Sequence, residues 1–133
     1  MKQIISVILI TAFSICANAQ KDSANLYKPK TVIGIASFYS TNLDGTKTST
    51  GETYRNSKFS GASNHFALNT WVRVTNLRNN KSIKVRINDR MHIKMAKRGR
   101  VIDLSRSAAK ELGFISRGLT RVKVEEIPNS QND

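Results

Sequence analysis

The 133 residues are enough for one domain and too few for two. Apolar residues make up 39% and charged residues 23%, which excludes collagen-like, coiled-coil and wholly disordered chains. The charge is less ordinary, because 22 Lys and Arg against 9 Asp and Glu give a formal net charge of +13. A field of that sign attracts anions such as nucleic acid, anionic lipid or acidic polysaccharide.

The N-terminal segment, residues 1–19, predicts a secretory signal peptide. Lys2 supplies a positive start, residues 4–16 are mostly apolar, and Ala17-Asn18-Ala19 fits a small-x-small site cleaved after Ala19. The apolar run is shorter than the ~18–20 residues that span a bilayer. We therefore expect an exported protein, in the periplasm, cell envelope or outside the cell, with no transmembrane segment after cleavage.

Cys16 is the only cysteine and lies inside the predicted signal. A lipid anchor at Cys16 is the alternative, but that processing favours a small residue before the cysteine, and the sequence has Ile15. Cleavage after Ala19 leaves no cysteine, which excludes disulfides, thiol catalysis and cysteine metal sites. Export also argues against nucleic acid as the partner.

The remaining chain divides into a polar linker over residues 20–30, one domain over 31–128 and a polar tail over 129–133. Alternating or continuous apolar patterns predict strands over residues 32–39, 71–75, 83–87, 101–104 and 121–125. Asn79-Asn80 predicts a hairpin turn between the second and third of these. Ser105 and Gly113 suggest the start and end of one helix. The pattern is mainly β and indicates a small closed barrel.

Three acids stand in unusual surroundings. Glu52 follows a Ser/Thr/Gly-rich loop, Asp89 ends a strand, and Asp103 lies within the apolar run Val101-Ile102-Asp103-Leu104. A carboxylate among apolar residues must be paired, hydrogen-bonded or shifted in pKa. Pairs of such acids serve glycosidic chemistry as general acid and as base or nucleophile.

Structural explanations remain open for all three acids. Asp103 can cap the following helix or pair with a buried arginine, Asp89 can bridge to Arg86 or Arg90, and Glu52 can be an ordinary loop acid. The two isolated histidines, His65 and His92, make a weak case for a metal site, and we expect neither metal nor cofactor. A basic stretch without acids is either a solvated loop or an anion-contacting rim; its members are Arg90, Lys94, Lys97, Arg98 and Arg100.

Seven motifs in a fixed order carry a family resemblance. They are Gly34-Ile35-Ala36-Ser37-Phe38-Tyr39, Thr50-Gly51-Glu52-Thr53-Tyr54, Ala62-Ser63-Asn64-His65, Trp71-Val72-Arg73-Val74-Thr75-Asn76-Leu77, Val85-Arg86-Ile87-Asn88-Asp89-Arg90, Gly99-Arg100-Val101-Ile102-Asp103-Leu104-Ser105 and Ala108-Ala109-x-x-Leu112-Gly113. The chain resembles the rare lipoprotein A (RlpA) family of bacterial cell-wall proteins over about residues 34–124.

The resemblance implies a six-stranded double-psi β-barrel with one or two short helices. It also implies lytic transglycosylase activity on peptidoglycan, preferably on glycan strands without stem peptides, with formation of 1,6-anhydromuramic acid ends. The family's active residues correspond to Glu52, His65 and Asp89, and Asp103 matches the acid of the Asp-Leu-Ser motif in related barrels such as expansins. On this basis we expect a monomer in which Tyr39, Tyr54, Arg90, Lys94 and Arg100 contact the glycan.

The sequence departs from the family pattern in two places. The segment after His65 is two residues shorter than usual, and the usual Asp-Arg-Gly-Pro-Phe is replaced by Asp89-Arg90-Met91-His92-Ile93. A non-catalytic, expansin-like glycan-binding barrel is therefore the alternative function. In either case we expect the barrel itself to bind the glycan, because no repeat domain for peptidoglycan binding follows Pro128.

Overall fold

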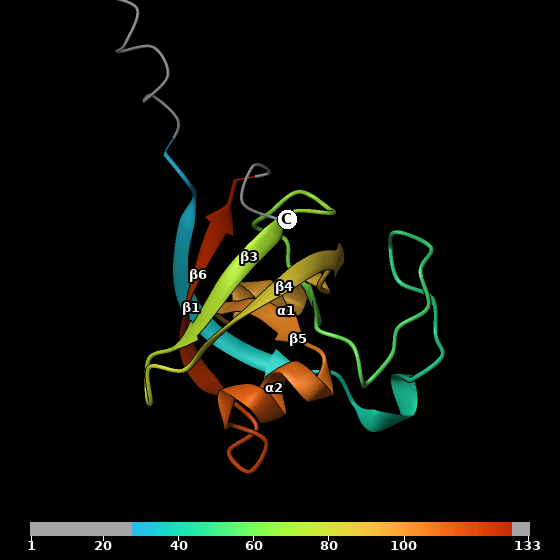
Figure 1. Cartoon of the computed structure of the whole chain (residues 1–133). Helices are drawn as coiled ribbons and strands as arrows, with labels where there is room; N and C mark the ends of the chain where they lie inside the picture. The colour runs from blue at the N-terminus through green and yellow to red at the C-terminus, as the bar shows by residue number, and fades with distance from the viewer. Residues whose placement is uncertain (1–27, 129–133) are drawn as a thin grey trace, which may run out of the picture.

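A computed structural model describes residues 28–128 (Figure 1). The predicted signal peptide, most of the predicted linker and the polar tail lie outside the described residues. The elements, in chain order, are strand β1 (Thr31–Phe38), 3-10 helix η3 (Thr41–Leu43), strands β2 (Ser60–Ala62), β3 (Trp71–Asn76) and β4 (Ser82–Asp89), helix α1 (Ile93–Lys97), strand β5 (Arg100–Leu104), helix α2 (Arg106–Leu112) and strand β6 (Thr120–Ile127).

The strands close into a barrel in the order β1-β5-β2-β4-β3-β6, which confirms the predicted six-stranded, mainly β architecture. Two pairs are parallel, β1 with β5 and β2 with β4, and the remaining four are antiparallel. The β3–β4 hairpin forms where Asn79-Asn80 predicted it, with Asn80 at a φ of 60°. Closure leaves no free edge between neighbouring strands of the barrel.

The barrel interior is filled by β-branched and aliphatic side chains at alternating strand positions. Val72 and Val74 of β3, Val85 and Ile87 of β4, and Val122 and Val124 of β6 are completely buried. Helix α2 packs Ala108, Ala109 and Leu112 onto this core. These alternating apolar residues are the signal that made most of the strands predictable from the sequence.

Helix α2 begins and ends near the predicted residues, but Ser105 does not cap it with its side chain. The Ser105 hydroxyl instead accepts a hydrogen bond from the backbone N–H of Ser60, at 3.3 Å, and so joins the helix start to β2. Gly113 ends the helix at a φ of 79°, as expected of a left-handed C-terminal residue.

Candidate functional site

Two of the three predicted acids lie on strands that pair with the same residue of β2 from opposite sides. Ala62, the last residue of β2, pairs with Asp89 of β4 on one side and with Asp103 of β5 on the other. Residues paired across adjacent strands project from the same face, and strands lie ~4.8 Å apart, so the two acids start about 10 Å apart on one face. The short strand β2 therefore brings together two carboxyl groups that are distant in the sequence.

Asp89 is surrounded by hydrogen-bond donors. The Tyr39 hydroxyl donates to Oδ2 at 2.5 Å. Oδ1 accepts from the Ser49 hydroxyl at 2.7 Å, from the Ser49 backbone N–H at 2.9 Å and from the Arg90 backbone N–H at 2.9 Å. The structure thus shows neither of the side-chain bridges considered for Asp89: Arg90 contributes its backbone, and Arg86 pairs elsewhere.

Asp103 has fewer partners and is more deeply placed. The Ser37 hydroxyl, on the neighbouring strand β1, donates to Oδ1. The Arg100 guanidinium lies near the same serine, with Nη1 3.4 Å from the Ser37 oxygen and 3.6 Å from the Met95 sulfur. Asp103 does not cap α2, since the residue at the helix start is Ser105.

The environments of the two acids push their pKa values in opposite directions. Burial raises the pKa of Asp103, and the charge of Asp89 adds to this, while the Ser37 hydrogen bond and Arg100 only partly offset it. Burial also raises the pKa of Asp89, but the hydrogen bonds from Tyr39, Ser49 and Arg90 outweigh it and leave that pKa below its usual value. Asp103 consequently retains a proton to higher pH than Asp89 does.

A small buried cluster of side chains holds in place the tyrosine that donates to Asp89. Tyr39 and Tyr54 stack with ring centroids 4.2 Å apart, and they pack with Ala62 and Met91. Tyr54 is 1% exposed, and its hydroxyl donates to Asn56 and accepts from the Arg106 backbone N–H. The structure thus gives both predicted glycan-contacting tyrosines a buried position, in which Tyr39 reaches Asp89 and Tyr54 backs Tyr39.

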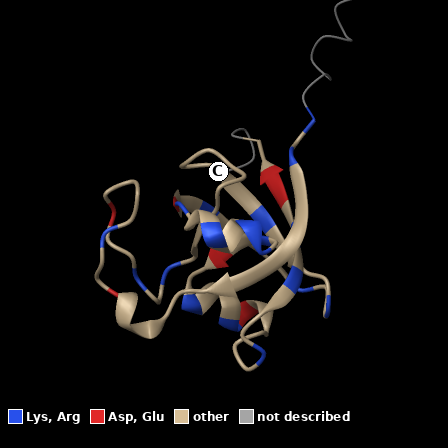
Figure 2. Cartoon of the chain, turned by 180° about the vertical axis from the view of Figure 1, so that it is seen from behind, with Lys and Arg blue, Asp and Glu red and all other residues tan. Residues whose placement is uncertain are grey.

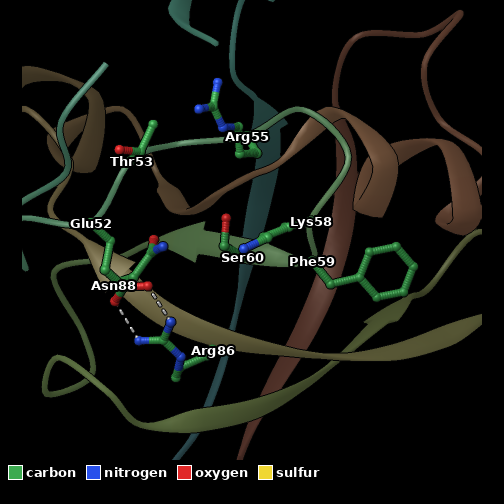
Figure 3. A pocket seen from close by; sticks show the side chains of 8 residues that line it. All are labelled: Glu52, Thr53, Arg55, Lys58, Phe59, Ser60, Arg86 and Asn88. Carbon is green, nitrogen blue, oxygen red and sulfur yellow. Dashed lines mark hydrogen bonds and ion pairs between the residues drawn. The ribbon is translucent and has the colours of Figure 1, made fainter. Parts of the chain in front are cut away.

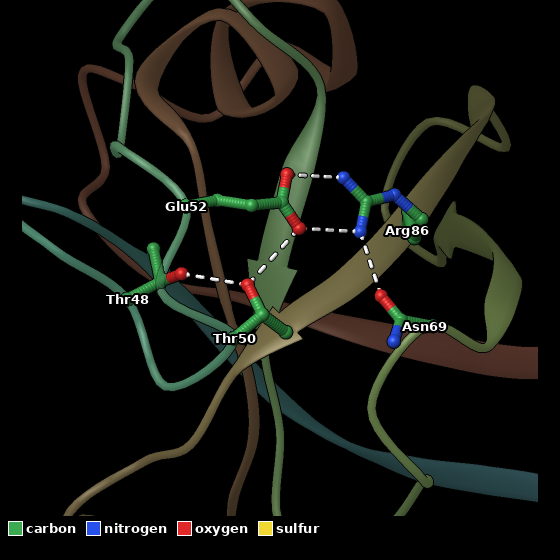
Figure 4. Close-up of polar contacts among 5 residues, drawn as sticks. All are labelled: Thr48, Thr50, Glu52, Asn69 and Arg86. Carbon is green, nitrogen blue, oxygen red and sulfur yellow. Dashed lines mark hydrogen bonds and ion pairs between the residues drawn. The ribbon is translucent and has the colours of Figure 1, made fainter.

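Among the described residues Glu52 makes no hydrogen bond with Asp89 or Asp103, and it forms instead a bidentate ion pair with Arg86 of β4 (Figure 4). The two Arg86 nitrogens lie 2.7 and 2.5 Å from the Glu52 oxygens, and the Thr50 hydroxyl donates to the same carboxylate at 3.0 Å. The hydrogen bonds from Arg86 lower the pKa of Glu52 to about 2. Arg86 also donates to the Asn69 side chain, so it ties the Glu52 loop to the segment before β3.

The predicted residues His65 and Arg90 meet at the loop after β2. One guanidinium nitrogen of Arg90 donates to the backbone carbonyls of Ser63 and Phe66 and so holds this loop in place. The His65 backbone N–H donates to the Ser63 hydroxyl, and its carbonyl accepts from the Lys30 ammonium. The contacts described for His65 are thus backbone contacts, and none of them joins it to Asp89, Asp103 or Glu52.

The basic stretch folds partly into α1, which faces the viewer in Figure 2 and is largely blue. Lys94 and Lys97 are exposed on this helix, and neither forms an ion pair within residues 28–128. Arg100 is half-buried beside Ser37 and Asp103. Arg100 therefore lies near Asp103, and the helix just before it in the chain exposes two further cations that can contact an anionic ligand.

Ser37 and Ser49, which bind the two acids directly, were not predicted from the sequence. Nothing distinguishes them among the other hydroxyl residues nearby, because their roles depend on barrel closure and on the loop over β4. The sequence suggests Arg86 only as a partner of Asp89, and its alternation with Val85 and Ile87 places it outside the core. The outward position of Arg86 was predictable from the sequence, but its pairing with Glu52, 34 residues away, was not.

A pocket of about 90 Å³ lies beside the Glu52–Arg86 ion pair (Figure 3). Its lining residues are Glu52, Thr53, Arg55, Lys58, Phe59, Ser60, Arg86 and Asn88. Within residues 28–128, no group of three or more His, Cys, Asp or Glu side chains is arranged to hold a metal ion. In the same residues, no helix has the length and apolar character needed to cross a membrane.

Comparison with known protein families identifies the family of this chain. Residues 31–124 match the family described as "Lytic transglycolase". The chain belongs to this family. The chain is also similar to proteins named "Endolytic peptidoglycan transglycosylase RlpA" from Haemophilus influenzae, 42% identical over 74% of this chain, and from Neisseria meningitidis, 39% identical over 84%.

The chain spans less than half the length of these relatives. It covers 33% of the Haemophilus protein and 48% of the Neisseria protein, and 27% of a relative with the same name from Pseudomonas aeruginosa that is 47% identical over 72% of this chain. The predicted resemblance to RlpA is therefore confirmed for the barrel domain.

Solved structures confirm the double-psi barrel. An expansin from Clavibacter michiganensis superposes with a TM-score of 0.60 at 20% identity, covering 75% of this chain and 52% of the expansin. A papain inhibitor from Streptomyces also gives a TM-score of 0.60 at 20% identity, covering 74% of this chain and 96% of the inhibitor. At this identity the similarity extends to the fold alone, and function must be argued from the site.

Proposed function

We propose that this domain cleaves the glycan strands of peptidoglycan as a lytic transglycosylase. The observation that carries the proposal is the Asp89–Asp103 pair, two acids on one face whose surroundings separate their pKa values. Such a separation assigns one carboxyl group as proton donor and the other as a charged base. The names of the family relatives support peptidoglycan as the substrate.

In this mechanism Asp103 is the general acid. Its proton passes to the glycosidic oxygen as the bond from that oxygen to the anomeric carbon of muramic acid breaks. The ionised Asp89 stabilises the positive charge that develops at that carbon and takes the proton of the muramic acid 6-hydroxyl. That hydroxyl oxygen bonds to the anomeric carbon, so a 1,6-anhydro end forms without addition of water. Asp103 regains its proton, and Asp89 loses one, by exchange with solvent.

The other predicted residues act around this pair. Arg86 keeps Glu52 ionised, so Glu52 serves to position the loop over residues 48–54 and does not donate the proton. Lys94 and Arg100 attract the lactyl carboxylate that a muramic acid without a stem peptide exposes, which supports a preference for such strands. A substrate of this kind lies in the cell envelope, in keeping with the predicted signal peptide.

The first test replaces each acid by its amide. We expect Asp103→Asn and Asp89→Asn each to lower product release from purified sacculi by at least about 100-fold, the range typical of general acid–base groups. Glu111→Gln, at an exposed acid on α2, is the matched control and should retain full activity. Circular dichroism must show all three variants folded. Full activity in folded Asp103→Asn would exclude Asp103 as the proton donor.

A non-catalytic glycan-binding barrel is the second candidate. The observation that favours it is the ion pair of Glu52, because a carboxylate tied to an arginine at 2.5 Å is poorly placed for chemistry. Such a protein would sediment with sacculi in a salt-sensitive way and release no new glycan ends. Release of new ends by the unmodified protein would exclude this candidate.

A further inference from the structure

We propose that the pocket between the Glu52 loop and β4 is a subsite for the acetamido group of an N-acetylated sugar. This inference rests on the proposed glycan function but concerns residues outside the Asp89–Asp103 pair. It starts from Asn88, whose side chain lines the pocket although the residue is only 5% exposed. The Oδ1 atom of Asn88 is buried and accepts no hydrogen bond from the residues that the structure describes.

A buried amide oxygen without a donor is unusual, since removing such a group from water is unfavourable unless a hydrogen bond replaces the water. The terminal torsion of an asparagine is broad, so the amide can turn its buried oxygen toward the pocket when a donor is present there. A ligand with an N–H group would supply the donor that the protein does not.

The remaining lining residues fit the rest of an acetamido group. Lys58 is exposed and forms no ion pair within residues 28–128, so its ammonium is available to a carbonyl oxygen. Phe59 is 43% exposed, which is high for a large apolar side chain, and offers a surface for a methyl group and the C–H face of a sugar ring. Figure 3 shows Lys58, Phe59 and Ser60 on one side of the pocket and Glu52, Asn88 and Arg86 on the other.

The size and charge of the pocket restrict the ligand further. A volume of about 90 Å³ holds a small substituent, while the pyranose ring itself must lie outside, over Phe59. Two of the three lining cations are already paired, Arg55 with Asp44 and Arg86 with Glu52, and a carboxylate would bring only acceptors to the Asn88 oxygen. An acetamido group has one N–H donor, one carbonyl acceptor and one methyl group, which match Asn88, Lys58 and Phe59 respectively.

Two trisaccharides that differ in their acetamido groups test the subsite. Tri-N-acetylchitotriose, called chitotriose below, and cellotriose share a β-1,4-linked backbone of glucose configuration, and only the former carries acetamido groups. In NMR titrations of the purified protein, we expect chitotriose to shift the Asn88 side-chain amide and the Phe59 ring signals and to bind at least about fivefold more tightly than cellotriose, the factor of one neutral hydrogen bond. Mass spectrometry of the recovered ligand checks that it remains intact.

Variants then locate the binding. Asn88→Leu removes an oxygen that has no partner, so it should preserve folding while it abolishes the difference between the two sugars. Lys58→Met should weaken chitotriose binding by roughly two- to fivefold, the scale of an exposed polar contact. Lys81→Met, in the β3–β4 turn on the opposite side of the molecule from the Glu52 loop (Figure 1), is the matched control and should leave binding unchanged.

The outcomes separate this subsite from the proposed activity. Equal binding of the two sugars, or chitotriose shifts confined to residues outside the pocket, would overturn the subsite even if the protein cleaves peptidoglycan. Selective chitotriose binding that Asn88→Leu abolishes would support the subsite even if the protein releases no glycan ends.

Discussion

At the scale of single residues, hydroxyl groups decide which acid holds a proton. Asp89 accepts from the Tyr39 and Ser49 hydroxyl groups, whereas among the described residues Asp103 accepts from the Ser37 hydroxyl only and is more buried. Hydrogen bonds to a charged carboxylate favour its ionised form, and burial disfavours it. Two aspartates of the same chemistry thus receive different roles from their neighbours.

Tyr39→Phe tests this balance, because phenylalanine keeps the ring that stacks on Tyr54 and removes only the hydroxyl. The hydroxyl favours ionised Asp89, so its loss should raise the pKa of Asp89 and move the acidic limb of the activity profile to higher pH. The stability contribution of a lowered pKa is present above the unfolded-state value and is lost as pH falls through the folded-state value. We therefore expect the variant to lose on the order of 1 kcal/mol at pH 7.

Two measurements check this prediction, a pH–rate profile and urea unfolding at neutral and acidic pH. The stability difference between the variant and the unmodified protein should shrink as the pH falls, since protonation of Asp89 removes the contribution in both. An unchanged acidic limb would show that Tyr39 does not control the ionisation of Asp89.

At the scale of elements, the site depends on a strand that the sequence pattern does not predict. Strand β2 has only the residues Ser60, Gly61 and Ala62, without the β-branched or aromatic residues typical of strands. It forms because β4 and β5 pair with it from both sides. Asp89 and Asp103 were predictable as candidates, since each stands at or within an apolar strand. That both pair with Ala62 was not predictable.

Helix α1 was also not predictable from the sequence, for a different reason. It has five residues and no buried side chain, so it shows no apolar periodicity. Its start is capped by the His92 ring, whose Nδ1 accepts from the Lys94 backbone N–H at 3.2 Å. Histidine is not a usual N-cap residue, so neither the helix nor the role of His92 could be read from the sequence.

A substitution at Gly34 tests how closely β1 and β5 must pack. A Cβ atom at this position would lie 2.3 Å from Val101 Cγ1 and 3.0 Å from the Gly99 carbonyl oxygen. Gly34→Ala should therefore lower the free energy of unfolding by about 1–3 kcal/mol through overpacking. Thr31→Ala, at the exposed start of the same strand, is the control and should stay within about 0.5 kcal/mol.

Urea unfolding measures both variants. A Gly34→Ala protein as stable as the unmodified one would show that Val101 can turn away without strain. The close contact would then not be what fixes β1 against the strand that carries Asp103.

At the scale of the whole molecule, the chain carries an excess of Lys and Arg, whereas its candidate site holds two acids. Arg100, at the start of β5, lies near Asp103, and Figure 2 shows further Lys and Arg on the helix that precedes this strand. Positive potential around a glycan site draws in an anionic polymer, and the carboxyl pair then acts on the neutral glycosidic bond. Composition alone indicated an anionic partner, and only the fold shows where the acids lie within that field.

The central claim is that Asp103 donates a proton and that no water enters the reaction. Mass spectrometry of the products from sacculi and from amidase-stripped glycan, with the unmodified protein and with Asp103→Asn, tests it most directly. We predict products that end in 1,6-anhydromuramic acid, more abundant from stripped glycan and absent with the folded variant. Products with ordinary reducing ends, or the same anhydro products from Asp103→Asn, would contradict the claim.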